Sequence, residues 1–296
     1  MEENLFKQQV WKSAWNHDPN TSLRIMQRLG QGDYQAEEFI KWAKSYDKNS
    51  FSYEGRQRSN RILTWIENQV GSFKDMAVLD IGAASGVFSI PFVEKGANVT
   101  AIEPSPDLAI MLENNAKHYS VQVEVIQKPF EVISTDKHNQ SYDLVFASMC
   151  PAIKDWDMVE KALSCAKKYC YISMMAGPKE NHLMDELMPN IGLKPREIGS
   201  SDIAYLQQLL YLRGYSYQTL IEKQMKTVKI DIDSAVDNLT DWFIEYGIPL
   251  EEKLLRKSEE YLRKTYEDEI SLRMGEGSEK FLFIWKIKNQ YYYLIN

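Results

Sequence analysis

Hydrophobic residues between positions 77 and 174 alternate between short continuous runs and stripes of helical spacing. Residues 77–81 and 99–102 are apolar runs typical of strands that are buried on both faces. Between them, residues 87–93 carry apolar side chains at helical spacing, and Gly96 is a suitable helix stop. Two strands joined through such a helix run parallel with a right-handed crossover. The pattern therefore predicts an α/β unit at the centre of the chain.

The alternation continues toward the C-terminus and predicts the rest of a mostly parallel sheet. Strands are expected at 121–125, 142–147, 169–174 and 218–232, and a terminal strand at 280–288. Helices are expected at 106–116, 159–166, 180–190 and 202–213, and two more over 234–274, split near Gly247. These patterns place the strands of the core in residues 73–232 and 279–296, with a helical segment at 233–278 between them.

Residues 1–72 read as a separate helical cap. Phe6, Val10 and Ala14 form one apolar stripe, with Trp11 and Trp15 beside it. Further helices are expected from Thr21 or Ser22 to Gly30, from Asp33 past Tyr46, and around Ile62, Ile66 and Val70. Four of the seven tryptophans, Trp11, Trp15, Trp42 and Trp65, fall in this cap. We expect them to pack in the core, with the alternative that one or two line a substrate pocket.

A glycine turn lies between the first strand and the first helix of the core. Gly82 and Gly86 bracket it, and backbone without side chains can approach a ligand closely. Glu103 follows the second strand, where an acid can accept hydrogen bonds from a pair of ribose hydroxyls. The dinucleotide fingerprint G-x-G-x-x-G fails, because Ala84 and Val87 occupy its second and third glycine positions. An adenosine-containing cofactor other than a dinucleotide is therefore favoured.

The stretch Asp80-Ile81-Gly82-x-x-x-Gly86, followed by Glu103, resembles the class I S-adenosylmethionine-dependent methyltransferases. The resemblance implies a Rossmann-like, doubly wound, mostly parallel seven-stranded sheet with an antiparallel last strand, and S-adenosylmethionine as cofactor. It also implies that the helical segment 233–278 is an insertion before the last strand that acts as a lid. It also implies that the strand-one acid and the glycine loop hold the methionine part, and that the strand-two acid holds the ribose. The loop after strand three should meet adenine. The residues so assigned are Asp80, Gly82, Ala83, Ala84, Gly86, Glu103, Pro104, Phe130 and Ser148.

The methyl acceptor is not specified by any motif. By resemblance, the loop after strand four lies beside the reactive methyl group, but Ser148-Met149-Cys150-Pro151 is not the pattern of amine methyltransferases. We assign Met149, Cys150, His182 and Tyr205 to the acceptor pocket, with His182 as the one histidine considered as a base. No histidine or cysteine has metal-ligand spacing. Pocket hydrophobicity and net acidity favour a small neutral or cationic acceptor.

Composition sets outer bounds on function. The formal net charge is −7, which argues against nucleic acid as the substrate because phosphate contacts rely on clustered Lys and Arg. No apolar run reaches the roughly 20 residues that span a bilayer, and the N-terminus has no apolar signal core. Three cysteines are too few for a disulfide framework. These features predict a cytoplasmic protein without a membrane segment.

Three functions remain open at this point. Methyl transfer by in-line displacement to a small molecule is favoured. A non-catalytic cofactor-binding or scaffold protein of the same fold is the alternative, because the acceptor side lacks diagnostic residues. An NAD-type oxidoreductase is disfavoured by the positions of Ala84 and Val87 and by the terminal strand.

Overall fold

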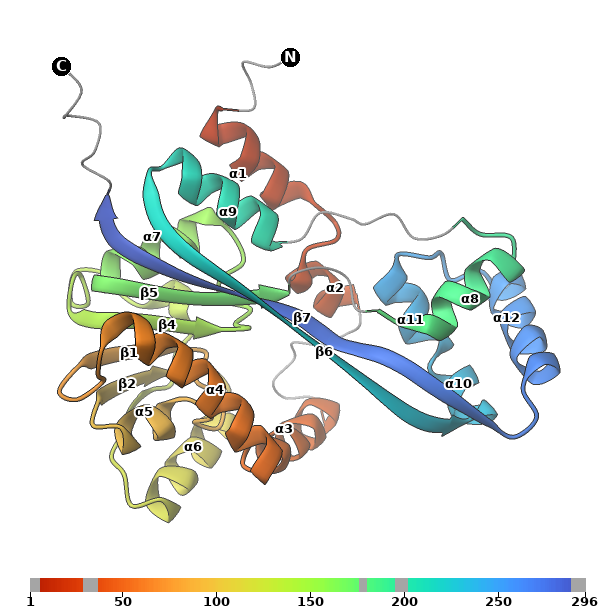
Figure 1. Ribbon diagram of the computed structural model, residues 1–296, viewed down its shortest axis with the longest axis horizontal. Coiled ribbons are helices and arrows are strands. Elements are labelled where there is room, and N and C mark those ends of the chain that lie inside the picture. Colours follow the sequence, from red (N-terminus) through yellow and green to blue (C-terminus); the bar gives the residue numbers. More distant parts are fainter. Residues whose placement is uncertain (1–5, 29–36, 176–179, 195–201, 289–296) are drawn as a thin grey trace.

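A computed structural model describes residues 6–28, 37–175, 180–194 and 202–288 (Figure 1). Its sheet has the strand order β3-β2-β1-β4-β5-β7-β6. Neighbours among the first five strands run parallel, whereas β7 is antiparallel to both β5 and β6. The strands of the parallel part are β1 (Ala77–Ile81), β2 (Asn98–Ile102), β3 (Glu124–Ile126), β4 (Tyr142–Ser148) and β5 (Ala166–Met175). This core is the mostly parallel α/β arrangement that the sequence predicts.

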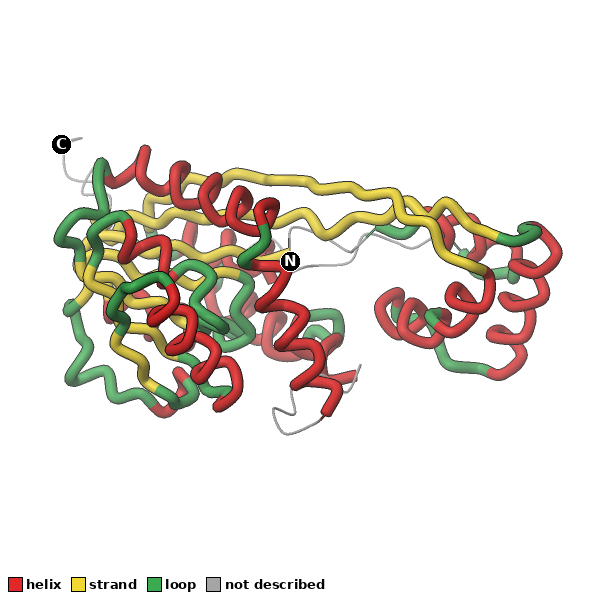
Figure 2. The backbone as a smooth tube through the Cα atoms, turned by 90° about the horizontal axis from the view of Figure 1, so that it is seen from below, coloured by secondary structure: helices red, strands yellow, loops and turns green. Residues whose placement is uncertain are grey.

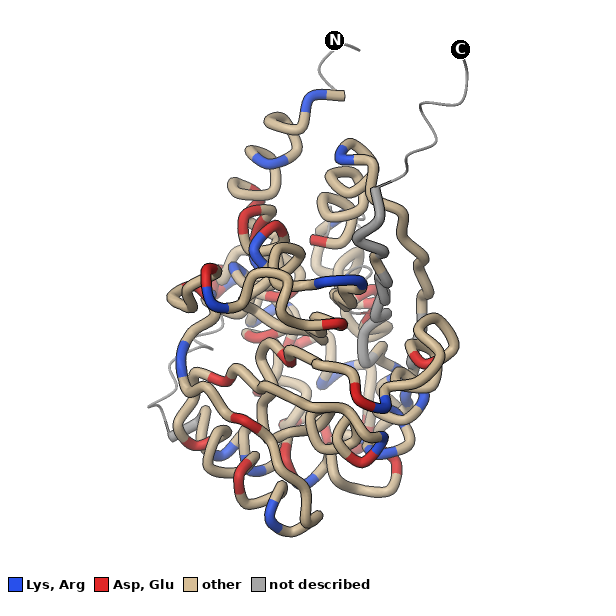
Figure 3. The backbone as a smooth tube through the Cα atoms, turned by 90° about the vertical axis from the view of Figure 1, so that its left-hand side faces the viewer, with Lys and Arg blue, Asp and Glu red and all other residues tan. Residues whose placement is uncertain are grey.

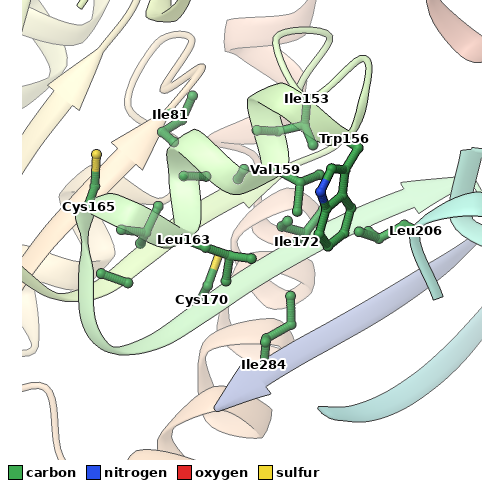
Figure 4. Close-up of a cluster of buried hydrophobic side chains, with 14 of the residues drawn as sticks. Ile81, Ile153, Trp156, Val159, Leu163, Cys165, Cys170, Ile172, Leu206 and Ile284 are labelled. Carbon is green, nitrogen blue, oxygen red and sulfur yellow. The ribbon is translucent and has the colours of Figure 1, made fainter. Parts of the chain in front are cut away.

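The central parallel strands β1, β2 and β4 are buried on both faces, which explains their continuous apolar runs, whereas the edge strand β3 is partly exposed. Successive side chains of β1 point to opposite faces. Val78 packs with Ile62 and Phe92, whereas Leu79 packs with Val159 and Leu206. The second of these clusters is drawn in Figure 4. Helices on the two faces are α4 (Tyr53–Val70), α5 (Ser89–Glu94), α6 (Pro106–His118), α7 (Trp156–Cys165) and α9 (Asp202–Leu212).

The last two strands leave the core as a long ribbon (Figures 1 and 2). β6 (Tyr215–Asp231) and β7 (Glu269–Lys288) pair along their whole length. At the far end the ribbon carries four helices that share a hydrophobic core of their own, which includes Leu187, Phe243 and Leu272. These helices are α8 (His182–Asn190), α10 (Ile232–Asp237), α11 (Leu239–Tyr246) and α12 (Glu252–Thr265). We call this unit the ribbon module.

The ribbon corrects several sequence-based boundaries. The terminal strand begins at Glu269, not at position 280, and the helical segment before it contains three helices that end at Thr265. The hydrophobic pattern did not indicate the first half of β7, because residues 269–280 include many polar side chains. A two-stranded ribbon outside the core needs no continuous apolar run. β3 is only three residues long, although the alternation extended from 121. The role of residues 233–278 as a lid stays a prediction; α11 does contact α2 (Ser22–Arg28) of the N-terminal cap.

The N-terminal cap is helical, but its first buried face is not the expected one. In α1 (Gln8–His17), Phe6 just before the helix and Val10 within it are exposed, and Trp15 is buried instead. The cause is a partner on α9: the Trp15 Nε1 group donates a hydrogen bond of 2.7 Å to Asp202. The third helix, α3 (Glu37–Ser50), lies within the described residues. Gly30, the expected end of the second helix, and Asp33, the expected start of the third, lie outside them.

We expect Asp202→Ala to detach α1 from α9. The Asp202 carboxylate accepts hydrogen bonds from Trp15 Nε1 and from the Ser22 backbone N–H at 2.8 Å, and it is buried. Leaving those donors without a partner costs about 1–3 kcal/mol each. Denaturant titration should show a free energy of unfolding about 3 kcal/mol lower than in the parent, whereas the control Asp136→Ala, at an exposed acid away from α1, should change it by less than about 0.5 kcal/mol. Equal stability of the two variants would contradict this account of the cap.

Candidate functional site

The glycine turn after β1 is a tight loop of left-handed residues. Gly82 has φ +72° and Gly86 has φ +90°, and Ala84 between them adopts φ +48°. The N–H groups of Gly82 and Ala83 both donate to the carbonyl of Ile102, at 2.8 and 3.1 Å, which ties the loop to the end of β2. Gly82 and Ala84 are partly exposed while their neighbours are buried. The loop thus presents backbone at the carboxyl edge of the parallel sheet, where open α/β folds bind ligands.

The carboxylate of Glu103 is held in a fixed orientation directly after β2. One oxygen accepts from the Ala84 N–H and the other from the Ser105 N–H, each at 2.9 Å. Its side chain is only 4% exposed, and burial raises its pKa above the ordinary value of 4.5, with the two N–H donors opposing that shift. Each carboxylate oxygen keeps a second lone pair. Glu103 is therefore an oriented acceptor for two further hydroxyl groups.

Asp80, the acid of β1, is a buried carboxyl group. It accepts a 2.6 Å hydrogen bond from the Ser89 hydroxyl at the start of α5. Burial, with a smaller contribution from the charge of nearby Glu103, raises its pKa to about 7, although the bond from Ser89 opposes this shift. Strongly shifted carboxyl groups in a cleft are typical of functional sites. The pair Asp80 and Glu103 would favour a cationic group placed between them and the solvent.

Cys150 lies against the glycine loop. A Cβ atom at Gly82 would come within 2.5 Å of the Cys150 Sγ, so glycine is required there by contact as well as by φ. Burial, together with the charges of Glu103 and Asp80, raises the pKa of the thiol to about 12. The thiol therefore stays protonated at neutral pH and is unsuited to act as a nucleophile. Its position beside Gly82 fits a soft lining of the cofactor and acceptor pocket.

The end of β4 brings three predicted residues to the same edge. Met149 adopts φ +49°, is 37% exposed, and its N–H donates to the carbonyl and the hydroxyl of Ser173 on β5. Ser148 Oγ lies 3.1 Å from the same Ser173 hydroxyl. Ser173 thus fixes the loop that carries Ser148, Met149 and Cys150, a role that the sequence did not indicate.

The ring of Phe130 is buried and does not present an open face for stacking. It follows β3 in a short 3₁₀ turn, is 1% exposed, and belongs to the hydrophobic core with Val159. The Lys161 ammonium lies 5.0 Å from its ring centroid. Core packing accounts for the burial of Phe130, and its assignment to the adenine side of the cofactor stays a prediction.

Two predicted acceptor residues lie elsewhere in the structure. His182 begins α8 in the ribbon module, and its Nδ1 accepts from the Arg273 N–H of β7 at 2.9 Å (Figure 1). Tyr205 of α9 packs against α1: its ring stacks on Trp15 with centroids 6.1 Å apart, and its hydroxyl donates to Asp18 at 2.8 Å. His182 lies away from the sheet edge because the chain after β5 leaves the core for the ribbon module, and Tyr205 because it is packed under α1 on a face of the core.

Two other residues near the loop were missed from the sequence. Ser105 caps α6, accepting from the Leu108 N–H at 3.4 Å, and the Ser-Pro pair at 105–106 is the signal that could have found it. Asn115 of α6 donates to the Ser85 carbonyl at 3.0 Å and to Asp47 of α3 at 2.7 Å. Asn115 thereby links the glycine loop to the N-terminal cap, and no local pattern predicts such a long-range bridge.

Within the described residues, neither the distribution of charge nor a cluster of metal ligands indicates a second candidate site. There, no group of three or more His, Cys, Asp and Glu side chains is placed to hold a metal ion. Figure 3 shows acidic and basic positions interspersed along the chain. Among the described helices, none is long and apolar enough to cross a membrane.

Comparison with known proteins agrees with this geometry. Residues 78–170, from β1 to β5, match the family model described as a methyltransferase domain. The resemblance to class I S-adenosylmethionine-dependent methyltransferases is thus confirmed for the segment that contains the glycine loop, Glu103 and the β4 loop. S-adenosylmethionine is the cofactor of these methyltransferases.

Individual relatives are distant. An uncharacterized protein of Haemophilus influenzae is 27% identical over 179 residues, which are 59% of this chain and 63% of that protein. The ubiquinone biosynthesis O-methyltransferase of Bordetella avium is 29% identical over 107 residues, covering 36% of this chain and 44% of the relative. The matches thus span less than two thirds of either relative. The magnesium protoporphyrin IX methyltransferase of Synechocystis PCC 6803, solved with bound SAM, is 13% identical with a TM-score of 0.44, over 94% of this chain and 96% of that chain.

The residues at the edge of the sheet fit this cofactor. Ser85, in the middle of the glycine loop, has a fully buried hydroxyl oxygen with no hydrogen-bond partner among the described residues. An unsatisfied buried hydroxyl is uncommon and marks a place where a partner is expected. Together with the oriented Glu103 carboxylate and the exposed backbone of Gly82 and Ala84, it leaves polar groups available at the point where the cofactor would lie.

Proposed function

We propose that this chain transfers a methyl group from S-adenosylmethionine to a small-molecule acceptor. The observation that carries the proposal is the Glu103 carboxylate, buried at the end of β2 and oriented by the N–H groups of Ala84 and Ser105. Such a group binds the ribose hydroxyls. Asp80 and the glycine loop hold the methionine part, and Pro104 and Ser148 flank the pocket.

The chemistry requires positioning more than acid–base catalysis. The cofactor supplies a methyl group on a sulfonium, which leaves as a neutral thioether. The chain's task is to hold the acceptor atom in line with that methyl group and to exclude water, and such positioning contributes several kcal/mol to the lowering of the barrier. Asp80 and Glu103 place negative charge near the cationic cofactor. The loop of Met149 and Cys150 lines the acceptor side.

A ligand panel separates the cofactor classes. In thermal-shift measurements we expect S-adenosylmethionine and S-adenosylhomocysteine to raise the melting temperature, because ligands that bind the native state stabilise it by mass action. NAD should leave it unchanged, since Ala84 and Val87 replace the dinucleotide glycines. Stabilisation by NAD alone would exclude the methyltransferase assignment.

Turnover separates an enzyme from a scaffold protein of the same fold. The chain is incubated with S-adenosylmethionine carrying a radioactive methyl group and with the small-molecule fraction of a cell extract. Transfer of the label to any acceptor would exclude a purely non-catalytic scaffold function. Tight cofactor binding with no transfer to any fraction would favour it.

A further inference from the structure

Two serine hydroxyl groups meet at the carboxyl edge of the sheet, one at the end of β4 and one on β5. Ser148 and Ser173 are direct partners in the pairing of these strands, and their Oγ atoms lie 3.1 Å apart. They differ in exposure: Ser173 is 1% exposed, whereas Ser148 is partly exposed. The hydroxyl that can reach a bound molecule is therefore that of Ser148, and the direction of the hydrogen bond between the two serines decides what it offers.

The hydrogen of the Ser173 hydroxyl is donated to Ser148. The Ser173 Oγ atom already accepts a hydrogen bond of 3.1 Å from the Met149 N–H. Among the described residues, Ser148 Oγ is the one other atom recorded within hydrogen-bond distance of that hydroxyl. If Ser148 were the donor, the hydrogen of the buried Ser173 hydroxyl would have no partner there, which is costly for a buried group. The donors therefore run from Met149 through Ser173 to Ser148, and the Ser148 hydrogen is left for an acceptor outside this network.

Ser148 lies on the face of the sheet that carries Asp80. Asp80 pairs with Phe146 across β1 and β4, and Ser148 follows two residues later on the same face, nearer the carboxyl edge. Directly after Ser148, Met149 turns the chain with a left-handed φ of +49°, and its N–H is held by both the carbonyl and the hydroxyl of Ser173. The Ser148 hydrogen is thus placed at the start of the loop that is assigned to the acceptor.

A hydrogen-bond donor at this place favours an acceptor molecule with a lone pair that takes no part in the reaction. An amine nitrogen has a single lone pair, which attacks the methyl group and so cannot also accept from Ser148. An oxygen next to the attacking atom can accept. A carboxylate oxygen would be repelled by the carboxylates of Asp80 and Glu103, whose charges reach this loop, whereas a carbonyl oxygen is neutral.

We propose that the Ser148 hydroxyl binds the methyl acceptor, and that this acceptor is a neutral molecule with a carbonyl oxygen next to the atom that receives the methyl group. Ser173 is a positioning residue, because it directs the Ser148 hydrogen outward. The assignment rests on the proposed methyltransferase function and adds to it the class of acceptor and the roles of two residues.

The test measures initial rates of methyl transfer from labelled S-adenosylmethionine to the small-molecule fraction of a cell extract. Ser148→Ala should lower the rate about fivefold, the effect of one hydrogen bond, and leave the affinity for S-adenosylhomocysteine, measured by calorimetry, within twofold of the parent. Ser148→Thr keeps the hydroxyl and should restore most of the rate. The matched control is Ser271→Ala, at an exposed serine of β7 in the ribbon module, which should change neither value.

A double-mutant cycle tests the role of Ser173. Ser173→Ala keeps the bond from the Met149 N–H to the carbonyl of residue 173, and should lower the rate because the Ser148 hydrogen is no longer directed. Added to Ser148→Ala, the same substitution should cause no further loss, because Ser173 acts through Ser148. Losses that simply add would reveal a general structural effect and overturn the positioning role.

The labelled product, isolated and identified by mass spectrometry and NMR, should carry a carbonyl oxygen next to the methylated atom. The proposal is overturned if the product lacks one, or if Ser148→Ala transfers label like the parent. It is also overturned if that variant loses S-adenosylhomocysteine by the same factor as the rate, because Ser148 would then serve the cofactor. If the parent itself binds no S-adenosylhomocysteine or transfers no label, the proposed function fails and the acceptor assignment fails with it.

Discussion

Glu103→Ala should weaken the binding of S-adenosylhomocysteine at least 100-fold. The substitution removes the oriented carboxylate that is proposed to accept both ribose hydroxyls, and hydrogen bonds to a charged group contribute about 1.5–3 kcal/mol each. It also leaves the N–H groups of Ala84 and Ser105 without their acceptor, which loosens the glycine loop. Isothermal titration calorimetry of the parent and the variant measures the change.

Two further variants make this result specific. Glu103→Gln keeps one acceptor oxygen and should give an intermediate affinity. Glu113→Ala removes an exposed acid on α6 and should bind like the parent. Far-ultraviolet circular dichroism checks that each variant is folded. If folded Glu103→Ala bound S-adenosylhomocysteine as tightly as Glu113→Ala, the ribose assignment would be wrong.

Asp80→Asn should stabilise the unliganded chain at neutral and higher pH. Burial raises the pKa of Asp80 from 3.8 to about 7, so the folded state favours the protonated form. The stability that this group contributes is complete below about pH 3.8 and is lost as the pH rises to about 7. A shift of this size corresponds to about 4 kcal/mol, as an order of magnitude. Asparagine stays neutral throughout and can still accept from Ser89.

Denaturant unfolding at pH 4.5 and at pH 8 tests this directly. The gain of Asp80→Asn over the parent should be small at pH 4.5 and should grow to several kcal/mol at pH 8. Asp136→Asn, at an exposed acid with no such burial, should show no comparable change. A gain that does not depend on pH would contradict the raised pKa. The stabilised variant should bind the cationic cofactor more weakly, since a carboxylate that costs stability is retained for binding.

The core of the fold could be predicted because its strands are buried on both faces. The runs at 77–81 and 99–102 carry a signal that depends only on local hydrophobicity, and the observed β1 and β2 match them closely. The same reasoning failed for the first half of β7, which pairs with β6 in a ribbon outside the parallel sheet. Only alternate residues there, Ile270 and Leu272, are buried against the helices of the ribbon module. Because no continuous apolar run marks this half, the boundary between insertion and sheet was placed too late.

In the candidate site, too, features set by the local sequence and the sheet topology could be predicted, and features set by distant contacts could not. That Asp80, Gly82, Gly86 and Glu103 lie together could be predicted because the topology fixes where the ends of β1 and β2 meet. The positions of His182 and Tyr205 away from this edge could not, because their surroundings come from contacts distant in sequence, with Arg273 and with Trp15. Asn115 was missed for that reason as well: its hydrogen bonds reach 30 and 68 residues along the chain.

The most direct measurement is a crystal structure of the chain with S-adenosylhomocysteine. We expect both ribose hydroxyls within hydrogen-bond distance of the Glu103 carboxylate, and the thioether sulfur between the glycine loop and the loop of Met149 and Cys150. A ligand bound away from the ends of β1 and β2, or a ribose that does not contact Glu103, would contradict the proposed cofactor site.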